Sequence, residues 1–228
     1  RAWPFRVDLA GPQGPAALFS YACDLARDPS QLPFGLINNA GVTSYGAFAT
    51  MSATELDRLL ALNVRATLEL TRLFLAGHEA APRREASLPA VAVLTIASVA
   101  AFVPVPYQSA YAASKHALLG FGESIAAEFA GRAVVTTFAP GGIETEMGDL
   151  SGTNHTVGTK HLAPAEWVAA KAVRAWKRGR VVATAGAENR LLRFVSRVVP
   201  HRIIGRNAER FFRPDGERRS SGGGNDGS

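Results

Sequence analysis

Short apolar runs alternate with segments of helical spacing along most of the chain. Continuous apolar runs at 35–37, 91–96 and 133–138 predict buried strands, and 5–7 and 180–185 are shorter candidates. Helical spacing predicts helices at about 16–26, 52–77, 109–130 and 164–178, the second opened by the capping box Ser52-Ala53-Thr54-Glu55. Strands that are apolar on both faces and separated by helices are typical of a doubly wound parallel sheet, the Rossmann-like α/β fold.

The pattern changes beyond Ala187. Between 188 and 213 apolar residues alternate with arginines at helical spacing, with a break at Pro200. This basic amphipathic segment has two interpretations: peripheral contact with an anionic membrane surface, or an extension that docks on the domain or on a neighbouring subunit. We favour the second. The sequence thus divides into a domain at 1–187, a C-terminal extension at 188–213 and a Gly/Ser-rich tail at 214–228 that we expect to be disordered.

Composition fits a globular protein in a reducing compartment. The chain has 228 residues, 47% hydrophobic and 19% charged, which suits one folded domain. Its single cysteine, Cys23, excludes an internal disulfide and a multi-thiolate zinc site, so a cytoplasmic location is the default. His155 and His161 are six residues apart without a third ligand nearby, and we expect no metal there.

The net charge of +6 comes from one part of the chain. Residues 1–170 hold 11 Lys/Arg and 14 Asp/Glu, whereas residues 171–220 hold 14 and 4. An arginine-rich helical face without a recognition motif is weak evidence for nucleic acid, and we expect no nucleic-acid partner. The most apolar stretch, 91–106, is interrupted by polar residues and prolines and is too short to span a membrane.

Candidate chemistry gathers where the predicted strands end. Ligands of doubly wound sheets bind at the carboxyl ends of the strands, which brings Asp8, the turn 38–41, Ser98 and the turn 140–145 together. Tyr111 and Lys115 follow, four residues apart on one helical face. A cation beside a phenol favours the ionised form, so we expect Lys115 to bring the pKa of Tyr111 down towards a range useful for acid-base chemistry.

The set as a whole resembles the short-chain dehydrogenase/reductase family. The resemblance rests on Asn38-Asn39-Ala40-Gly41, Asn63, Ser98, Tyr111-Ala112-Ala113-Ser114-Lys115 and Pro140-Gly141-Gly142-Ile143-Glu144-Thr145, in that order and at those spacings. It covers roughly residues 8–185. It implies an NAD(P)-dependent oxidoreductase that interconverts a secondary alcohol and a ketone by hydride transfer.

The resemblance also assigns roles to residues. Tyr111 would exchange a proton with the substrate oxygen, Ser98 would polarise that oxygen, Lys115 would hold the nicotinamide ribose, and Asn63 would anchor a water of the proton relay. The cofactor, NAD or NADP, would lie along a further set: Asp8 at the adenine, Asn39, Ala40 and Gly41 on the adenosine side, and Pro140, Gly141, Ile143 and Thr145 at the nicotinamide, together with Tyr111 and Lys115.

One family feature is missing from the sequence. The Gly-x-x-x-Gly-x-Gly turn that holds the cofactor pyrophosphate does not occur. The chain matches the family from about its third strand, so the fold is expected to lack the first strands and helices. Either the chain is a fragment of a longer gene product, which we favour, or it is a natural truncation that no longer binds cofactor. The residue that would choose between NAD and NADP is not in the sequence.

The resemblance implies a class of substrate and a mode of assembly. The loop 146–162 and the residues after Ser98 would contact a small alcohol or ketone. The helices at 54–75 and 109–129 would pack in a homodimer or homotetramer. The alternative class is a non-catalytic relative or fragment that binds a partner without turnover. A serine hydrolase is disfavoured because Ala97-Ser98-Val99 is not a Gly-x-Ser-x-Gly turn.

Overall fold

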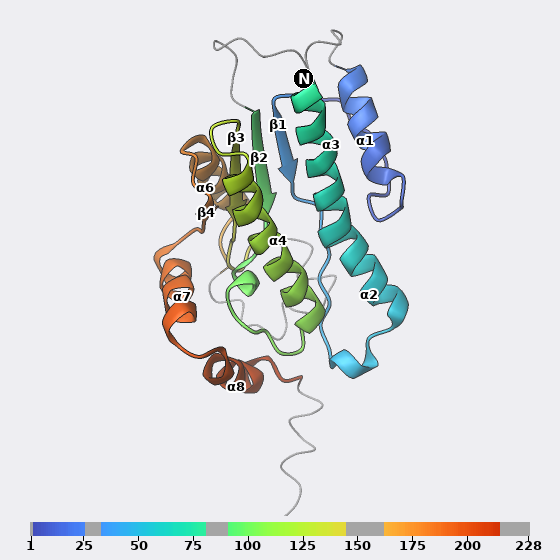
Figure 1. The fold of residues 1–228 in the computed structure, drawn as a ribbon. Helices are drawn as coiled ribbons and strands as arrows, with labels where there is room; N and C mark the ends of the chain where they lie inside the picture. The colour runs from blue at the N-terminus through green and yellow to red at the C-terminus, as the bar shows by residue number, and fades with distance from the viewer. Residues whose placement is uncertain (1, 26–32, 81–90, 145–161, 215–228) are drawn as a thin grey trace, which may run out of the picture.

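The computed structural model describes residues 2–25, 33–80, 91–144 and 162–214. They form a parallel four-stranded sheet in the order β1-β2-β3-β4, with helices on both faces (Figure 1). The strands are β1 (Gly35–Asn38), β2 (Val91–Ile96), β3 (Ala133–Phe138) and β4 (Val182–Ala183). The predicted Rossmann-like α/β arrangement is thus confirmed for the part of the chain that the structure describes.

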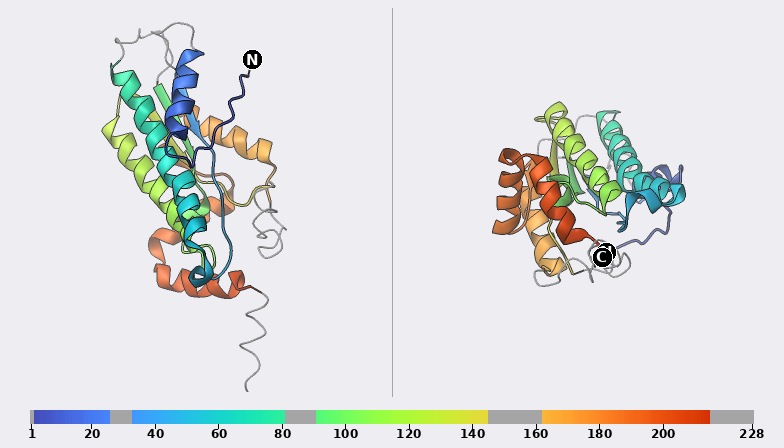
Figure 2. Two further views of the ribbon diagram at one scale, coloured as in Figure 1. Left: turned by 90° about the vertical axis from the view of Figure 1, so that its right-hand side faces the viewer. Right: turned by 90° about the horizontal axis from the view of Figure 1, so that it is seen from below.

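Two helical layers enclose the sheet. One face carries α3 (Ala66–Ala80) and α4 (Ser109–Glu128), with α1 (Gly14–Asp24) packed on α3, and the other carries α6 (Ala165–Lys177) (Figure 2). The helix α4 approaches β3 closely because Gly122 lies over Thr137, where a Cβ on Gly122 would come within 1.9 Å of the threonine Oγ1. The two central strands, β2 and β3, therefore lie between helices on both sides.

The long helix predicted at 52–77 is built from three pieces. The capping box opens α2 (Ala53–Leu60): the Ser52 Oγ accepts from the Glu55 amide at 3.2 Å, and the Ser52 amide donates to Glu55 Oε2 at 3.1 Å. A π-helical segment, η2 (Ala61–Arg65), separates α2 from α3. Such a segment inserts extra backbone into a continuous helix, and Asn63 sits inside it.

Two predicted strands differ from the structure. The segment 5–7 is not a strand, because no strand of the described chain lies beside it to accept and donate ladder hydrogen bonds. The last strand, predicted at 180–185, covers only Val182–Ala183, since only these two residues pair with the carboxyl end of β3. Short 3-10 helices, η1 (Phe48–Thr50) and η3 (Val99–Ala101), complete the loops that follow β1 and β2.

The C-terminal segment forms two helices, α7 (Ala187–Val198) and α8 (His201–Phe212), on either side of Pro200. They pack on the end of the molecule where the loops after the strands gather (Figure 1). Leu192, Ile204 and Phe212 contact the apolar cluster that includes Phe102 and Val103. The residues 215–228 of the expected disordered tail lie outside the described residues.

Candidate active site

The candidate site lies at the carboxyl ends of β1, β2 and β3. Ser98 follows β2, and the amide next to it, on Val99, donates to the Pro140 carbonyl at 2.8 Å, which joins the segments after β2 and β3. Ala97 likewise donates to the Phe138 carbonyl at 2.8 Å. These bonds extend the parallel pairing beyond the strands, so the predicted convergence of Ser98 and Pro140 is present in the structure.

Asn63 connects the loop after β1 to the helix α4. The side chain is fully buried. Its Oδ1 accepts from the Val42 amide and its Nδ2 donates to the Val42 carbonyl, both at 2.8 Å, and Nδ2 also donates to Ser114 Oγ at 3.1 Å. Ser114 in turn donates to the Tyr111 carbonyl at 2.7 Å. The π-helical turn thereby holds the first turn of α4, where Tyr111 is placed.

The Ser98 hydroxyl acts on the Tyr111 phenol and lowers its pKa. Burial raises the pKa of Tyr111, and the effect of Ser98 opposes that rise only in part. This direction is opposite to the lowering expected from Lys115. The Lys115 Nζ is 5.5 Å from the centre of the tyrosine ring, and burial of the phenol is the largest influence on its pKa.

Lys115 is a buried amine, 5% exposed. Its Nζ donates to the Ile96 carbonyl at 3.2 Å. Because burial disfavours the charged form, the pKa of Lys115 falls to about 8. The ammonium has three hydrogens, so further donors on Nζ remain for a ligand that enters beside Ile96.

Gly41 packs between two of the predicted site residues. A Cβ at Gly41 would come within 3.2 Å of Asn63 Oδ1 and 3.7 Å of Lys115 Nζ. The absence of a side chain therefore lets the backbone after β1 approach both polar groups. Asn39, on the same turn, lines an apolar pocket of about 410 Å³ with Ile143 between the sheet and α6.

The predicted nicotinamide-side residues are divided between two cavities. Ile143 lines the pocket with Asn39, whereas Gly141 lines a neighbouring pocket of about 430 Å³ with residues of α6 and α7. A Cβ on Gly141 would come within 2.6 Å of the Asn189 side chain. Thr145 and residues 146–161 of the expected substrate loop lie outside the described residues, as do the two histidines of that loop.

Asp8 lies in a different place from the other predicted residues. Its exposed carboxylate accepts from the Ala10 amide at 3.0 Å in the turn before α1. It lines a pocket of about 1020 Å³ together with residues of α2, η2 and α3 such as Arg65. None of Ser98, Tyr111 or Lys115 borders that pocket, so its size does not make it the centre of the chemistry.

Sequence reasoning missed several groups that hold the site. Ser114 was part of the quoted motif without a role of its own, although its spacing of three from Tyr111 placed it on the same helical face. Asn38 is buried and donates to Thr71 Oγ1 at 3.0 Å and to Thr95 Oγ1 at 3.4 Å, linking β1 to α3 and β2. No spacing rule could have found these long-range partners.

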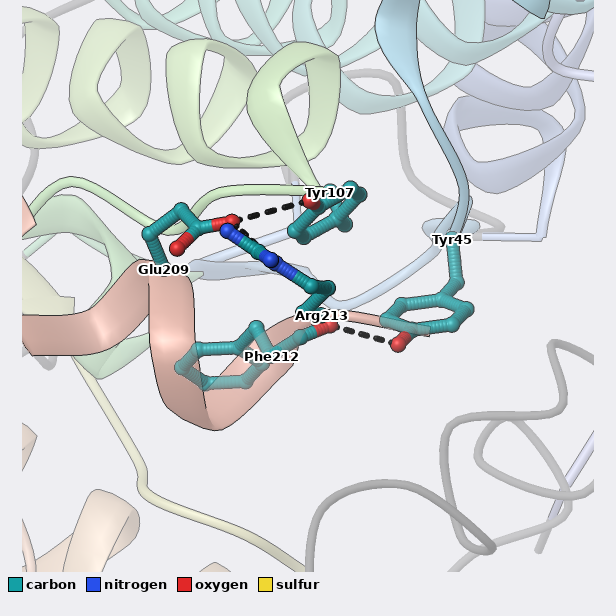
Figure 3. A network of polar contacts seen from close by, with 5 residues as sticks. All are labelled: Tyr45, Tyr107, Glu209, Phe212 and Arg213. Carbon is teal, nitrogen blue, oxygen red and sulfur yellow. Dashed lines mark hydrogen bonds and ion pairs between the residues drawn. The ribbon is translucent and has the colours of Figure 1, made fainter. Parts of the chain in front are cut away.

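A second missed network joins α8 to the loops beside the site (Figure 3). Tyr107, which has a positive φ of 63°, donates to Glu209 Oε1 at 3.0 Å, and the same carboxylate accepts from Arg213 Nε at 2.7 Å. Tyr45 donates to the Phe212 carbonyl at 2.6 Å. The C-terminal helix is therefore fixed to the segments that follow β1 and Ser98.

Comparison with known proteins places the chain in a family. A family model described as short chain dehydrogenase matches residues 26–155. Nodulation protein G of Rhizobium sp. (strain N33) is 38% identical over 115 residues, covering 50% of this chain and 44% of that protein. The 2-(S)-hydroxypropyl-CoM dehydrogenase 3 of Xanthobacter autotrophicus is 33% identical over 134 residues, covering 57% and 50%. The chain thus spans about half the length of the curated relatives it matches.

A solved structure shows the same fold. The short-chain dehydrogenase from Burkholderia cenocepacia J2315 in complex with NADP superposes with a TM-score of 0.70 at 21% identity, over 90% of this chain and 80% of that one. The family model covers more than half of the sequence and includes the Asn63, Ser98 and Tyr111–Lys115 positions. By this match, the chain belongs to the short-chain dehydrogenase family.

Proposed function

We propose that this chain is the catalytic part of an NAD(P)-dependent oxidoreductase that interconverts a secondary alcohol and a ketone. The observation that carries the proposal is the joining of four side chains at the strand ends. Ser98 acts on the Tyr111 phenol, Lys115 Nζ lies 5.5 Å from the centre of the same ring, and Asn63 holds the turn that carries Tyr111 through Ser114.

The described residues fit the ribose and nicotinamide end of a dinucleotide. Lys115 donates one hydrogen bond to the Ile96 carbonyl and offers further donors for hydroxyl groups. Ile143, expected at the nicotinamide, lines an apolar pocket together with Ile96, whose carbonyl accepts from Lys115. The glycine-rich pyrophosphate turn does not occur in the sequence, so these residues account for one end of the cofactor. When bound, a nicotinamide dinucleotide supplies or accepts the hydride.

Tyr111 is suited to donate a proton to the substrate oxygen. With its pKa raised by burial, the phenol is protonated at neutral pH and can donate as negative charge develops on a carbonyl oxygen during reduction. In the oxidation direction the tyrosine must first lose its proton, so that direction gains from higher pH. Ser98, whose hydroxyl acts on the phenol, would donate to the same oxygen and polarise it.

Lys115 and Asn63 support that step. Lys115, with its pKa lowered to about 8, is a cation at neutral pH beside the tyrosine and would bind the ribose hydroxyls. Both amide hydrogens of Asn63 are engaged by Val42 and Ser114, which makes its side chain a positioning group for Tyr111. The water that Asn63 was expected to anchor stays a prediction.

Substitution of the tyrosine tests the proposed reaction. In the full-length gene product, Tyr111→Phe removes the proton donor and keeps the ring, and we expect turnover of a secondary alcohol and ketone panel to fall about 10²- to 10⁴-fold. Binding of NADH or NADPH, followed by fluorescence, should change little. The matched control is Tyr21→Phe. Tyr21 is on α1, away from the site, where its ring stacks on Phe5, and this variant should keep full turnover. Equal turnover by the Tyr111 variant would contradict the assignment.

Assembly and substrate choice belong to the same proposal. The helices α2, α3 and α4 would form the contact of a homodimer or homotetramer, and the pocket of about 1020 Å³ along α2 and α3 lies on that surface. The substrate is a small alcohol or ketone, the cofactor is NAD or NADP, and the location is the cytoplasm. In the described residues no helix is both long enough and apolar enough to cross a membrane.

A further inference from the structure

The helices α7 and α8 each have two apolar rows. The inner row packs on the domain: Leu192, Ile204 and Phe212 contact the cluster that contains Phe102, and Tyr111 borders the same cluster. The outer row is composed of large apolar side chains that face away from the domain. A helix that only docked on the domain would need one such row, because its other side would face water.

The inner side is held by polar contacts as well as by packing. Glu209 accepts from Tyr107 and from Arg213, and the end of α8 accepts from Tyr45 (Figure 3). Gly205 packs on Pro104: a Cβ at position 205 would lie 3.5 Å from the Cβ of the proline. The domain therefore already fixes α8, and the outer row is not needed for its attachment.

The outer row exposes an unusual amount of apolar surface. In α7, Leu191, Phe194 and Val198 are spaced at i, i+3 and i+7, which places them in one row, and each is 62% exposed. In α8, Ile203 and Phe211 are 48% and 55% exposed. Exposed single apolar residues are ordinary on a protein surface, but five large ones on two consecutive helices mark an interaction surface.

Arginines flank these apolar residues. Arg202, Arg206 and Arg210 are spaced by four along α8 and all are exposed, as are two further arginines of α7, Arg190 and Arg197. A pocket of about 450 Å³ on α8 is lined by Arg206 and Arg210 next to Ile203, and by the Arg213–Glu209 pair described above. Exposed guanidinium groups beside exposed apolar side chains form a surface that suits a layer with negative headgroups above an apolar interior.

The positive charge of the arginines favours an anionic bilayer over a second copy of the chain as the binding partner of this surface. A second copy of the chain bound through the same face would bring the arginines of both copies together, which opposes association. The described helices include none able to cross a bilayer, so contact would be with the membrane surface. An anionic bilayer satisfies both the arginines and the apolar rows.

We propose that α7 and α8 bind the surface of an anionic lipid bilayer, with Leu191, Phe194 and Val198 in the acyl boundary and the five exposed arginines of the two helices on the headgroups. The domain then lies on the bilayer with the cluster bordering Tyr111 on the inner side of these helices. This inference does not depend on the oxidoreductase reaction, because vesicle binding requires no turnover.

Co-sedimentation of the full chain with lipid vesicles tests the inference. We expect binding to vesicles of phosphatidylcholine with phosphatidylglycerol, weaker binding as salt is raised, and little binding to phosphatidylcholine alone. Each basic side chain near an anionic surface strengthens binding about fivefold, so the triple variant Arg202→Gln, Arg206→Gln, Arg210→Gln should bind about 100-fold more weakly.

The matched control removes three exposed arginines elsewhere: Arg174→Gln, Arg178→Gln and Arg180→Gln. This variant has the same net charge as the triple variant of α8 and should keep vesicle binding within about twofold. Phe194→Ser tests the apolar row and should weaken binding at every salt concentration. Circular dichroism of each variant shows whether it is folded.

Three results would overturn the inference. One is no binding of the folded chain to anionic vesicles, and another is an equal loss in the two triple variants, which would make the effect one of net charge. The third is a stable dimer in solution that the α8 variant dissociates while vesicle binding is absent, which would assign the surface to a second copy of the chain.

Discussion

Burial of the Lys115 amine is expected to lower the free energy of unfolding, by an amount that can be worked out from its pKa. Its pKa falls from an ordinary value of 10.5 to about 8 because burial disfavours the ammonium. At about 1.4 kcal/mol per pKa unit, holding the charge in the folded protein at neutral pH costs about 3 kcal/mol relative to the unfolded chain. The folded state thus carries a destabilising group at the site where function would need it.

Replacing the amine by an apolar side chain should remove that cost. Lys115→Met keeps the length of the side chain and loses the donor to the Ile96 carbonyl, which costs about 1 kcal/mol. The net expectation is that the free energy of unfolding at neutral pH rises by about 2 kcal/mol. The proposed turnover should be lost at the same time.

The pH dependence of stability provides a second signature. Between the folded pKa of about 8 and the unfolded value of 10.5, the unfolded state binds more protons at Lys115. The contribution of this residue to stability is therefore unfavourable below that window and fades as pH rises through it, so the free energy of unfolding should increase with pH there. Lys115→Met should flatten this part of the profile.

Urea denaturation followed by circular dichroism measures both effects. Lys177→Met, an exposed lysine near the end of α6, is the control and should change neither the neutral-pH stability nor the slope between the two pKa values. A Lys115→Met protein that is folded but less stable than the parent would refute the reasoning, because the amine would then be a net stabilising group.

Three further predictions concern packing and docking. Gly122→Ala should lower the free energy of unfolding by about 1–3 kcal/mol because its Cβ would overlap a side chain of β3, whereas Gly120→Ala, in open space one half-turn earlier, should raise it by up to about 1 kcal/mol. Asn63→Ala should lower it by about 2–4 kcal/mol, since it leaves a buried backbone amide and carbonyl without their partner. Glu209→Gln should weaken the contacts of α8 to the domain and speed amide hydrogen exchange in His201–Phe212, with little change in the sheet.

Each of these has an outcome that contradicts its premise. Equal changes in the free energy of unfolding for the two glycine substitutions would mean that the space between α4 and β3 can accept a Cβ at position 122. An Asn63→Ala protein as stable as the parent would mean that the amide is not what holds the turn after β1. Unchanged exchange in α8 after Glu209→Gln would place its attachment in the apolar contacts alone.

The elements that were predicted most accurately from the sequence are those determined by their own residues rather than by contacts with distant ones. The strands at 91–96 and 133–138 have the predicted bounds because each is a short run of apolar and β-branched residues that ends at a turn. The π-helical turn at Asn63 escaped prediction, since one inserted backbone position barely disturbs helical spacing. The segment 5–7 was mispredicted because a strand is stabilised by a neighbour, which spacing does not reveal.

The site shows the same division. Its residue types and order were visible in the sequence, but the direction of the Tyr111 pKa depended on burial, which only the packed structure provides. The contact of Glu209 with Tyr107 joins residues about a hundred positions apart, and no motif spacing predicts it. The roles of the predicted site residues stay predictions until they are tested by substitution.

Titration of the full-length gene product with NADH and with NADPH, followed by fluorescence, tests the central claim most directly. The account predicts saturable binding of at least one of the two, weakened by Lys115→Met and unchanged by Lys177→Met. Binding of neither dinucleotide by the folded protein, or equal binding by the Lys115→Met variant, would contradict a nicotinamide site built around Lys115 and Tyr111.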